Sequence, residues 1–380
     1  MIYGERIRQV RELMGWTQEQ ASELLGITQP SIAKIEGDRI RVSEQIVEKL
    51  SIASGFPPSF FSREPEFDFP AGSLLFRAHA AMTVRETAEI YRYAQLTFGM
   101  FRWIVKQKKF KPFPTNLPVN ASSDPRDAAA LTRSELGLSP DKPIPHLTHA
   151  LENAGILILA LPKTFEHRDA FSLWSGFDRA RPVIVLVGGK SGDRLRMNMS
   201  HELGHLVMHK PIVNPIQEME KQAFEFAAEF LMPAKQMRLE IIPPVTLDML
   251  GRLKQRWGVS IQALIYRSRE LEIINARKYT YLFQQLSARG WRMREPRMFD
   301  TPVEKPRLMR QLAEIVYGNP IRYKKLAENL GMPENLVRAI IEAHAKRTPD
   351  AAASSVLPMP ENPKPKADVV QFKRTKVSIS

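Results

Sequence analysis

The chain has 380 residues, of which 43% are hydrophobic, and its formal net charge is +14. This length exceeds that of one ordinary core, so we expect two or three domains. The chain contains no cysteine, which excludes disulfides, thiolate metal ligands and a cysteine nucleophile and fits a reducing cytoplasm. No apolar run approaches the roughly 18 residues that a membrane span needs. We therefore expect a cytoplasmic protein without membrane contact.

The positive charge favours polyanionic partners, nucleic acid before membrane. It is unevenly spread, because residues 1–56 hold seven Lys or Arg against eight Asp or Glu. The basic excess lies in KQKKFK, residues 106–111, and in a later set: Arg267, Arg269, Arg277, Lys278, Arg289, Arg292, Arg294 and Arg297. A solvated helix face explains each cluster as well as a binding surface does.

The first fifty residues contain three closely spaced helical patterns. A Thr17–Gln20 capping-box pair opens the second helix, TQEQASELL. Gly26 then supplies a tight turn, and Thr28 is expected to cap a third short helix, QPSIAKIE. Helix, glycine turn and helix in this order form the helix-turn-helix arrangement.

Later segments mix helices with a few strands. Helical patterns cover roughly 84–106, 124–136, 144–154, the HELGHLVMH stretch and 217–231, and helix signals continue to about residue 346. The runs GILILALP and RPVIVLVGG predict buried strands, and FSLWSGF between them is a third candidate. An exposed strand such as VIVLVG could pair with an extended peptide, and a core strand is the alternative.

These patterns divide the chain into five expected regions. They are 1–56, a helix-turn-helix domain; 57–120, a linker with connecting helices; 121–275, a central domain; 276–348, a helical region; and 349–380, a disordered tail rich in Pro, Ala, Ser and Lys. LAENLGMPENLVRAII can be laid over ASELLGITQPSIAKIE so that Gly331 meets Gly26. This match makes the helical region a candidate second helix-turn-helix, although any two packed helices give a similar pattern.

The N-terminal segment resembles the XRE, or lambda-repressor-like, family of helix-turn-helix domains. The resemblance covers roughly residues 3–56 and rests on the spacing of Thr17-Gln18, Gly26 and Ile35-Glu36-Gly37. It implies binding of a double-stranded DNA operator, and the near-neutral charge then requires a homodimer for useful affinity. A helical bundle used for protein contact is the alternative.

The same resemblance places the N-terminal end of QPSIAKIE in the major groove. It assigns Gln29, Ser31 and Lys34 to base edges, and Gln18 and Arg39 to the vicinity of phosphates. Glutamine can pair bidentately with adenine, so this chemistry suits the placement.

The stretch HELGHLVMH, residues 201–209, has the spacing of a metal site. Residues four apart lie on one face of a helix, so His201 and His205 can converge on one ion while Glu202 reaches its bound water. A helix rises about 1.5 Å per residue, so His201 and His209 are about 12 Å apart along the axis. They cannot both bond one zinc ion at about 2 Å, and we expect the third ligand on another element.

The following helix offers four carboxylates for this role: Glu218, Glu220, Glu225 and Glu229. A second resemblance separates them. MSHELGHLVMH followed by EKQAFEFAAEFLMP is similar to the two motifs of the ImmA/IrrE metallopeptidase family, and the match covers about residues 125–275. It implies a zincin-like fold, zinc (Zn2+) ligands at His201, His205 and Glu220, and Glu202 as the catalytic general base.

The chain departs from this family at one position. Where the family often has Asn four residues after the ligand glutamate, this chain has Phe224. A phenyl ring does not hydrogen-bond, so it does not orient a ligand histidine.

Together these features predict a multidomain, mainly α chain: an all-α helix-turn-helix, a central α+β zincin-like domain with a small sheet, and a C-terminal helical region. The resemblances imply a transcriptional regulator with a zinc-dependent endopeptidase that cleaves a repressor or antitoxin-like protein, or itself, in a stress or phage-related response. One alternative is a non-catalytic regulator that uses the metallopeptidase fold for sensing or dimerisation. Another is a toxin–antitoxin component.

Overall fold

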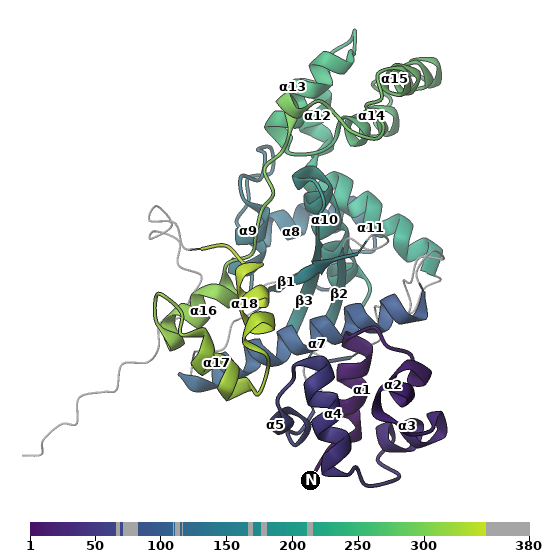
Figure 1. Cartoon of the computed structure of the whole chain (residues 1–380). Coiled ribbons are helices and arrows are strands. Elements are labelled where there is room, and N and C mark those ends of the chain that lie inside the picture. The colour runs from purple at the N-terminus through teal and green to yellow at the C-terminus, as the bar shows by residue number, and fades with distance from the viewer. Residues whose placement is uncertain are drawn as a thin grey trace, which may run out of the picture.

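The computed structural model describes residues 1–65, 69–70, 83–108, 110, 115, 117–165, 170–175, 181–210 and 216–346. The architecture is mainly helical around a three-stranded sheet, with the first helices at one end of the molecule (Figure 1). No helix among the described residues is long and apolar enough to cross a membrane. The tail that we expect to be disordered, and part of the expected linker region 57–120, lie outside these residues.

The N-terminal unit consists of helices α1 (Gly4–Leu13), α2 (Gln18–Leu25), α3 (Gln29–Glu36), α4 (Glu44–Ser54) and α5 (Pro58–Phe61). The capping box of α2 is confirmed: Gln20 N donates to Thr17 Oγ1 at 3.1 Å, and Thr17 N donates to Gln20 Oε1 at 2.9 Å. Gly26 takes a φ of 69° between α2 and α3, which a residue with a Cβ rarely adopts. Thr28 precedes α3 as expected, but its hydroxyl bonds to Ser31 Oγ and caps no backbone N–H.

The helix α7 (Val84–Gln107) joins this unit to the rest of the molecule (Figure 1). Arg92 of α7, only 4% exposed, donates to Glu5 and to Glu12 of α1 at 2.6 Å each. A buried charge is costly unless it is paired and hydrogen-bonded. These ion pairs therefore favour one orientation of α1 on α7.

The sheet contains strands β1 (Leu157–Thr164), β2 (Ala170–Ser175) and β3 (Arg181–Gly188), so all three expected strands are present. Their order is β1-β3-β2, with β1 parallel and β2 antiparallel to β3. The run VIVLVG lies in β3, the central strand, and both of its edges are paired. It cannot add a peptide strand, so its interpretation as an exposed strand was wrong and the core-strand alternative holds.

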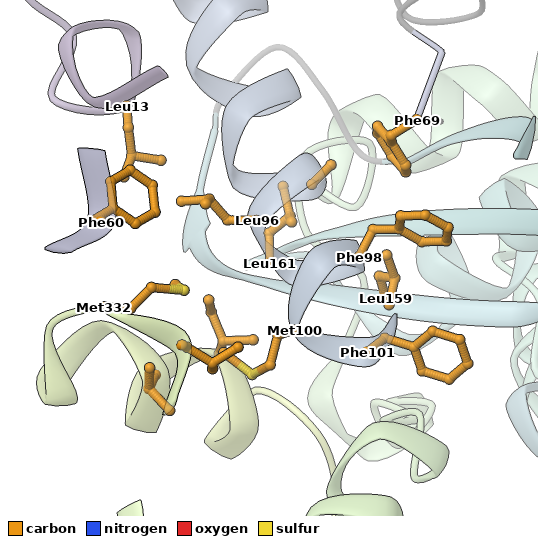
Figure 2. Close-up of a cluster of buried hydrophobic side chains, with 14 of the residues drawn as sticks. Leu13, Phe60, Phe69, Leu96, Phe98, Met100, Phe101, Leu159, Leu161 and Met332 are labelled. Carbon is orange, nitrogen blue, oxygen red and sulfur yellow. The ribbon is translucent and has the colours of Figure 1, made fainter. Parts of the chain in front are cut away.

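Alternation along β2 decides which side chains face the helix that follows the sheet. Successive side chains of a strand point to opposite faces. Phe171 and Leu173 belong to the apolar cluster on the α7 side, where Leu159 of β1 packs near Phe98 and Phe101 (Figure 2). Ser172 therefore points to the other face, which helix α10 (Gly192–Met208) covers.

The central helices surround that face of the sheet. They are α8 (Pro125–Glu135), α9 (Leu147–Asn153), α10 and α11 (Ile216–Leu231). At Gly204 of α10, an added Cβ would lie 3.1 Å from the Phe226 ring and 3.2 Å from Ala223 Cα. Glycine here lets α11 approach α10 closely. The chain continues through α12 (Ala234–Glu240), α13 (Leu247–Trp257), α14 (Ile261–Glu270), α15 (Ala276–Ala288) and the 3₁₀ turn η1 (Arg297–Phe299).

The last helices are α16 (Leu308–Tyr317), α17 (Tyr323–Leu330) and α18 (Glu334–Glu342). Helix α17 starts at position 323, which is 305 residues after the start of α2 at position 18. Helix α18 starts at position 334, which is also 305 residues after the start of α3 at position 29. Gly331 has a φ of 62°, close to that of Gly26. Met332 follows this turn and packs near Met100 of α7, opposite Leu13 and Phe60 of the N-terminal unit (Figure 2).

The candidate second helix-turn-helix differs from the N-terminal one in the residues of its second helix. The counterparts of Gln29, Ser31 and Lys34 are Glu334, Leu336 and Ala339. These side chains offer no hydrogen-bond donor to a base edge, and α18 packs against β1. We therefore propose that the C-terminal helices stabilise the core and do not read DNA.

The buried His344 connects this C-terminal unit to the sheet. Ala160 N donates to His344 Nε2 at 3.2 Å, and Nδ1 lies 2.9 Å from Ile340 O. Burial lowers the pKa of His344 to about 4, and the charges of Arg310 and Lys305 act in the same direction. The folded pKa lies below the unfolded value of about 6.5. Stability from the neutral ring is therefore present above pH 6.5 and is lost as the pH falls through 4.

We expect protonation of His344 to lower the free energy of unfolding by about 3 kcal/mol between pH 6.5 and pH 4. Urea unfolding at a series of pH values measures this change. The variant His344→Gln should be less stable at pH 7 but should show a flatter pH dependence over this range. Equal pH slopes in the two proteins would contradict the assigned role of His344.

Candidate functional site

The HELGH motif lies in the second half of α10, between the sheet and α11. His201, Glu202 and His205 are buried, each at most 8% exposed. The helix packs on β2 with one face and on α11 with another, which places the motif between a strand edge and the glutamates of the next helix.

Three side chains converge at this place. His201 Nε2 lies 3.1 Å from His205 Nε2 and 3.1 Å from Glu220 Oε2, and His205 Nε2 lies 3.4 Å from Glu220 Oε1. One donor atom from each residue lies within 4.8 Å of the others. Two imidazole nitrogens and one carboxylate oxygen match the protein ligands of His₂Glu catalytic zinc sites. The structure thus brings together the three residues that we expected as ligands.

Glu220 is the only glutamate of α11 that reaches these histidines. Glu218 and Glu225 lie beside other side chains of α11, and Glu229 pairs with Arg267. Each of these three carboxylates therefore contacts a partner outside the donor group. Glu220 is the one residue of α11 that contributes a carboxylate to it.

The charge of Glu220 suits a cation. Burial acts to raise the pKa of its carboxyl, but hydrogen bonds and charges from His201 and His205 outweigh burial. The pKa therefore stays well below its usual range, and the group is a carboxylate at neutral pH. Imidazole nitrogen beside carboxylate oxygen fits a transition metal better than magnesium or calcium, which prefer oxygen alone.

A hydroxyl from the sheet holds Glu202. Ser172 Oγ donates to Glu202 Oε2 at 2.6 Å, and both side chains are buried. Glu202 does not belong to the donor group. Its carboxylate is therefore held by β2, one position along α10 from His201.

His209 lies behind His205 and outside the donor group. Its Nδ1 is 2.9 Å from His205 Nδ1, and its Nε2 is 3.0 Å from Gln222 Oε1. Gln222 in turn donates to Glu218 Oε1 at 3.3 Å, which sets the orientation of the amide. The amide oxygen only accepts, so a neutral His209 carries its proton on Nε2 and accepts from Nδ1–H of His205. This chain directs the lone pair of His205 Nε2 toward the donor group.

His201 has a different environment. Its Nδ1 is buried and has no hydrogen-bond partner among the described residues. The ring of Phe224 lies 4.2 Å from the His201 ring, centroid to centroid. The departure from the family pattern at Phe224 thus falls beside one of the two histidines of the donor group, and ring packing is the contact found there.

The expected DNA contacts lie on α2, on α3 and, for Arg39, in the turn that follows α3. Gln29, Lys34 and Arg39 are exposed, and Ser31 is partly exposed. Gln18 is held at the start of α2, because its Nε2 donates to Glu36 Oε2 at 2.9 Å and its Oε1 accepts from Gln29 at 2.9 Å. These contacts support the N-terminal end of α3 without covering it.

Two family models match the chain. A helix-turn-helix model matches residues 7–61, and a peptidase-family model described as an IrrE N-terminal-like domain matches residues 151–269. The chain joins a helix-turn-helix domain to an IrrE-like domain. The IrrE-like match begins in α9 and ends in α14, so it includes the sheet and both helices of the donor group.

Similar curated proteins match part of the chain. The HTH-type transcriptional regulators PuuR of Escherichia coli (strain K12) and of Shigella flexneri are each 35% identical to the chain over 63 residues. This match covers 17% of the chain and 34% of each relative. The chain therefore spans about a third of the length of the curated relatives that it matches.

The IrrE-like domain contains two contacts that were not predicted from the sequence. Ser172 reaches Glu202 only because β2 packs on α10, and no pattern in FSLWSGF marks this serine. The contact between His209 and His205 follows the spacing of four residues, which was available in the sequence. The prediction from this spacing concerned metal ligation by His209 and did not include a hydrogen bond between His209 and His205.

Proposed function

We propose that the chain is a DNA-binding transcriptional regulator whose IrrE-like domain is a zinc-dependent endopeptidase. The observation that carries this proposal is the convergence of His201, His205 and Glu220 beside a Glu202 that Ser172 holds in place. The match of this region to a peptidase family supports the same conclusion.

The chemistry divides between the metal and the chain. His201, His205 and Glu220 would hold the zinc ion, and the bound ion would supply Lewis acidity that activates water near pH 7 and polarises a carbonyl. Glu202 accepts the proton of the attacking water and returns it to the leaving amine. The peptide C–N bond breaks, and the products are a carboxylate and an amine. Ser172 limits Glu202 to one orientation, so the base is in place before substrate binds.

The free edge of β2 is a suitable place for substrate. Among the described strands β2 is an edge strand, because only β3 pairs with it. A peptide that adds to this edge in extended form lies near Glu202, since Ser172 of the same strand contacts it. We propose that the substrate is an extended segment of a repressor or antitoxin-like protein, or of the chain itself.

The direct test combines metal analysis with a search for cleavage. The purified chain is analysed for zinc and is then incubated alone and with the product of its neighbouring gene. Mass spectrometry of fragments identifies any cut bond. Zinc-dependent fragments support the proposal, whereas intact proteins in the presence of bound zinc would count against endopeptidase action on either target.

For the DNA-binding role, we expect the double variant Gln29→Ala/Lys34→Ala to bind the DNA upstream of the protein's own gene at least tenfold more weakly than wild type. Each good base contact contributes about 1–3 kcal/mol of discrimination. Fluorescence anisotropy measures the affinity. Glu334→Ala, at the matching position of α18, is the control and should leave the affinity unchanged. Equal losses of DNA affinity in both variants would show that α3 does not make the base contacts.

The expected homodimer remains a prediction. The near-neutral helix-turn-helix domain requires two copies for useful affinity, and the operator should then be an inverted repeat with half-sites about one helical turn apart. Sedimentation velocity of the free and DNA-bound protein distinguishes one copy from two.

Phe224 favours a second candidate function, a non-catalytic regulator. Among the residues that the structure describes, none bonds to Nδ1 of His201, and such partners usually strengthen metal binding. In this reading the domain serves sensing or dimerisation. A chain that purifies without metal, and whose operator binding is unchanged in His201→Ala, would support it. The sequence of the neighbouring gene distinguishes a toxin–antitoxin component from these two candidates, because the toxin–antitoxin role differs from them mainly in genetic context.

A further inference from the structure

A basic surface lies at the end of the molecule opposite the helix-turn-helix domain (Figure 1). It consists of α15 and the segment that follows, residues 276–298, and is called here the α15 surface. Its six cationic side chains are Arg277, Lys278, Arg289, Arg292, Arg294 and Arg297. All are exposed except Lys278, which is partly buried.

The only carboxylate of this segment is engaged elsewhere. Glu295 Oε2 accepts from Lys254 Nζ at 2.7 Å, and Glu295 Oε1 accepts from Ile261 N at 3.0 Å. Glu295 thereby anchors the segment to α13 and to the start of α14. None of the six cations forms an ion pair within the described part of the chain. Their charge is therefore uncompensated at the surface.

Aromatic rings lie between the cations. Three charged groups lie over ring centroids: Lys278 over Tyr281 at 5.2 Å, Arg289 over Trp291 at 5.0 Å and Arg292 over Phe283 at 5.5 Å. Tyr281 is 49% exposed, and the neighbouring Tyr266 is 56% exposed. Cations interleaved with accessible rings are typical of surfaces that contact nucleic acid.

The apolar face of α15 is already packed. Leu282 and Leu286 are fully buried, and Tyr279 and Phe283 contact Tyr266 of α14. A helix that binds a membrane needs its apolar face free for the lipid. Tyr281, Met293 and Met298 remain exposed on this surface, but the six cations of the same segment favour phosphates over acyl chains.

The charge distribution of the whole chain supports a role in polyanion binding. The helix-turn-helix domain is nearly neutral, with seven cationic and eight acidic residues over 1–56. Electrostatic attraction to phosphates needs excess cations. We propose that the α15 surface binds the phosphate backbone of nucleic acid without sequence preference, as a second contact separate from the base-reading helix α3.

The test measures binding of the full chain to nucleic acid of arbitrary sequence. The probes are a 24-base-pair mixed-sequence DNA duplex, a 24-nucleotide RNA and vesicles that contain phosphatidylserine, each titrated between 50 and 200 mM salt. The variant Arg289→Gln/Arg292→Gln/Arg294→Gln removes three cations of the surface. Lys235→Gln/Lys324→Gln/Lys325→Gln removes three exposed cations elsewhere and is the matched control.

We expect the surface variant to bind the duplex on the order of tenfold more weakly at low salt. The slope of log affinity against log salt should fall by about 2.7 for duplex and about 2.1 for single strands, because each phosphate contact contributes about 0.9 or 0.7. The control should keep the wild-type slope. A second variant, Arg277→Gln/Lys278→Gln, should reduce the duplex slope by about 1.8.

Comparison of the probes identifies which nucleic acid the surface prefers. A loss confined to duplex or to RNA assigns that form as the partner, and both results support the proposal. Wild-type affinity and slope in the surface variant would overturn it. Binding to anionic vesicles with no binding to either nucleic acid would also overturn it and would assign the surface to a membrane.

Discussion

Replacing Glu202 with Gln is expected to leave zinc content near one ion per chain while lowering cleavage about 10²- to 10⁴-fold. Glu202 lies outside the donor group, so the ligands are intact in this variant. Gln has the same size and accepts the hydrogen bond of Ser172, but its amide does not take a proton from water. A positioned general base contributes about this factor. Zinc analysis and fragment mass spectrometry measure the two quantities.

Glu225→Gln is a matched control for this experiment. Glu225 is a glutamate of α11 beside Lys221 and outside the donor group, so the control should keep both zinc and cleavage. Full cleavage by Glu202→Gln would contradict the role of Glu202 as base. Loss of zinc in that variant would instead make Glu202 a ligand and would require a different mechanism.

Removing the ring of His209 is expected to weaken zinc binding about 10- to 100-fold. His209 accepts from Nδ1–H of His205 and so directs the lone pair of His205 Nε2 toward the donor group. Partners that orient a ligand histidine typically contribute this much to metal affinity. Competition with a chromophoric chelator gives the affinity of wild type and of His209→Ala. His209→Gln, whose amide oxygen can accept the same proton, should recover part of the loss.

The His201 side of the site provides the contrast. Phe224 contacts the His201 ring without a hydrogen bond, so Phe224→Leu should change zinc affinity far less than His209→Ala does. A simple structural effect of His209 would not be rescued by His209→Gln. Equal zinc affinity in wild type and His209→Ala would show that the hydrogen-bonded chain from His205 to Gln222 does not support the ligand.

Local periodicity accounts for the parts of the site that the sequence predicts. His201 and His205 share a face because the helix repeats every 3.6 residues, and this holds whatever the helix packs against. Glu220 could not be chosen from Glu218, Glu225 and Glu229 on periodicity alone, because the choice depends on how α11 approaches α10. The family motif supplied that information.

Contacts between elements account for the parts that it does not. Ser172 meets Glu202 through the packing of β2 on α10, across 30 positions of sequence. The central place of β3 follows from the strand order, which the apolar run VIVLVG does not encode. The helices of the N-terminal unit depend on capping and turn residues, so their order could be read from the sequence.

Zinc content of three dialysed proteins tests the central claim most directly. If His201, His205 and Glu220 form the metal site, wild type and Glu202→Gln should each retain about one zinc ion per chain. Glu220→Ala should retain much less after the same dialysis, because one of three protein ligands is gone. Equal zinc content in wild type and Glu220→Ala would contradict the assignment of this site.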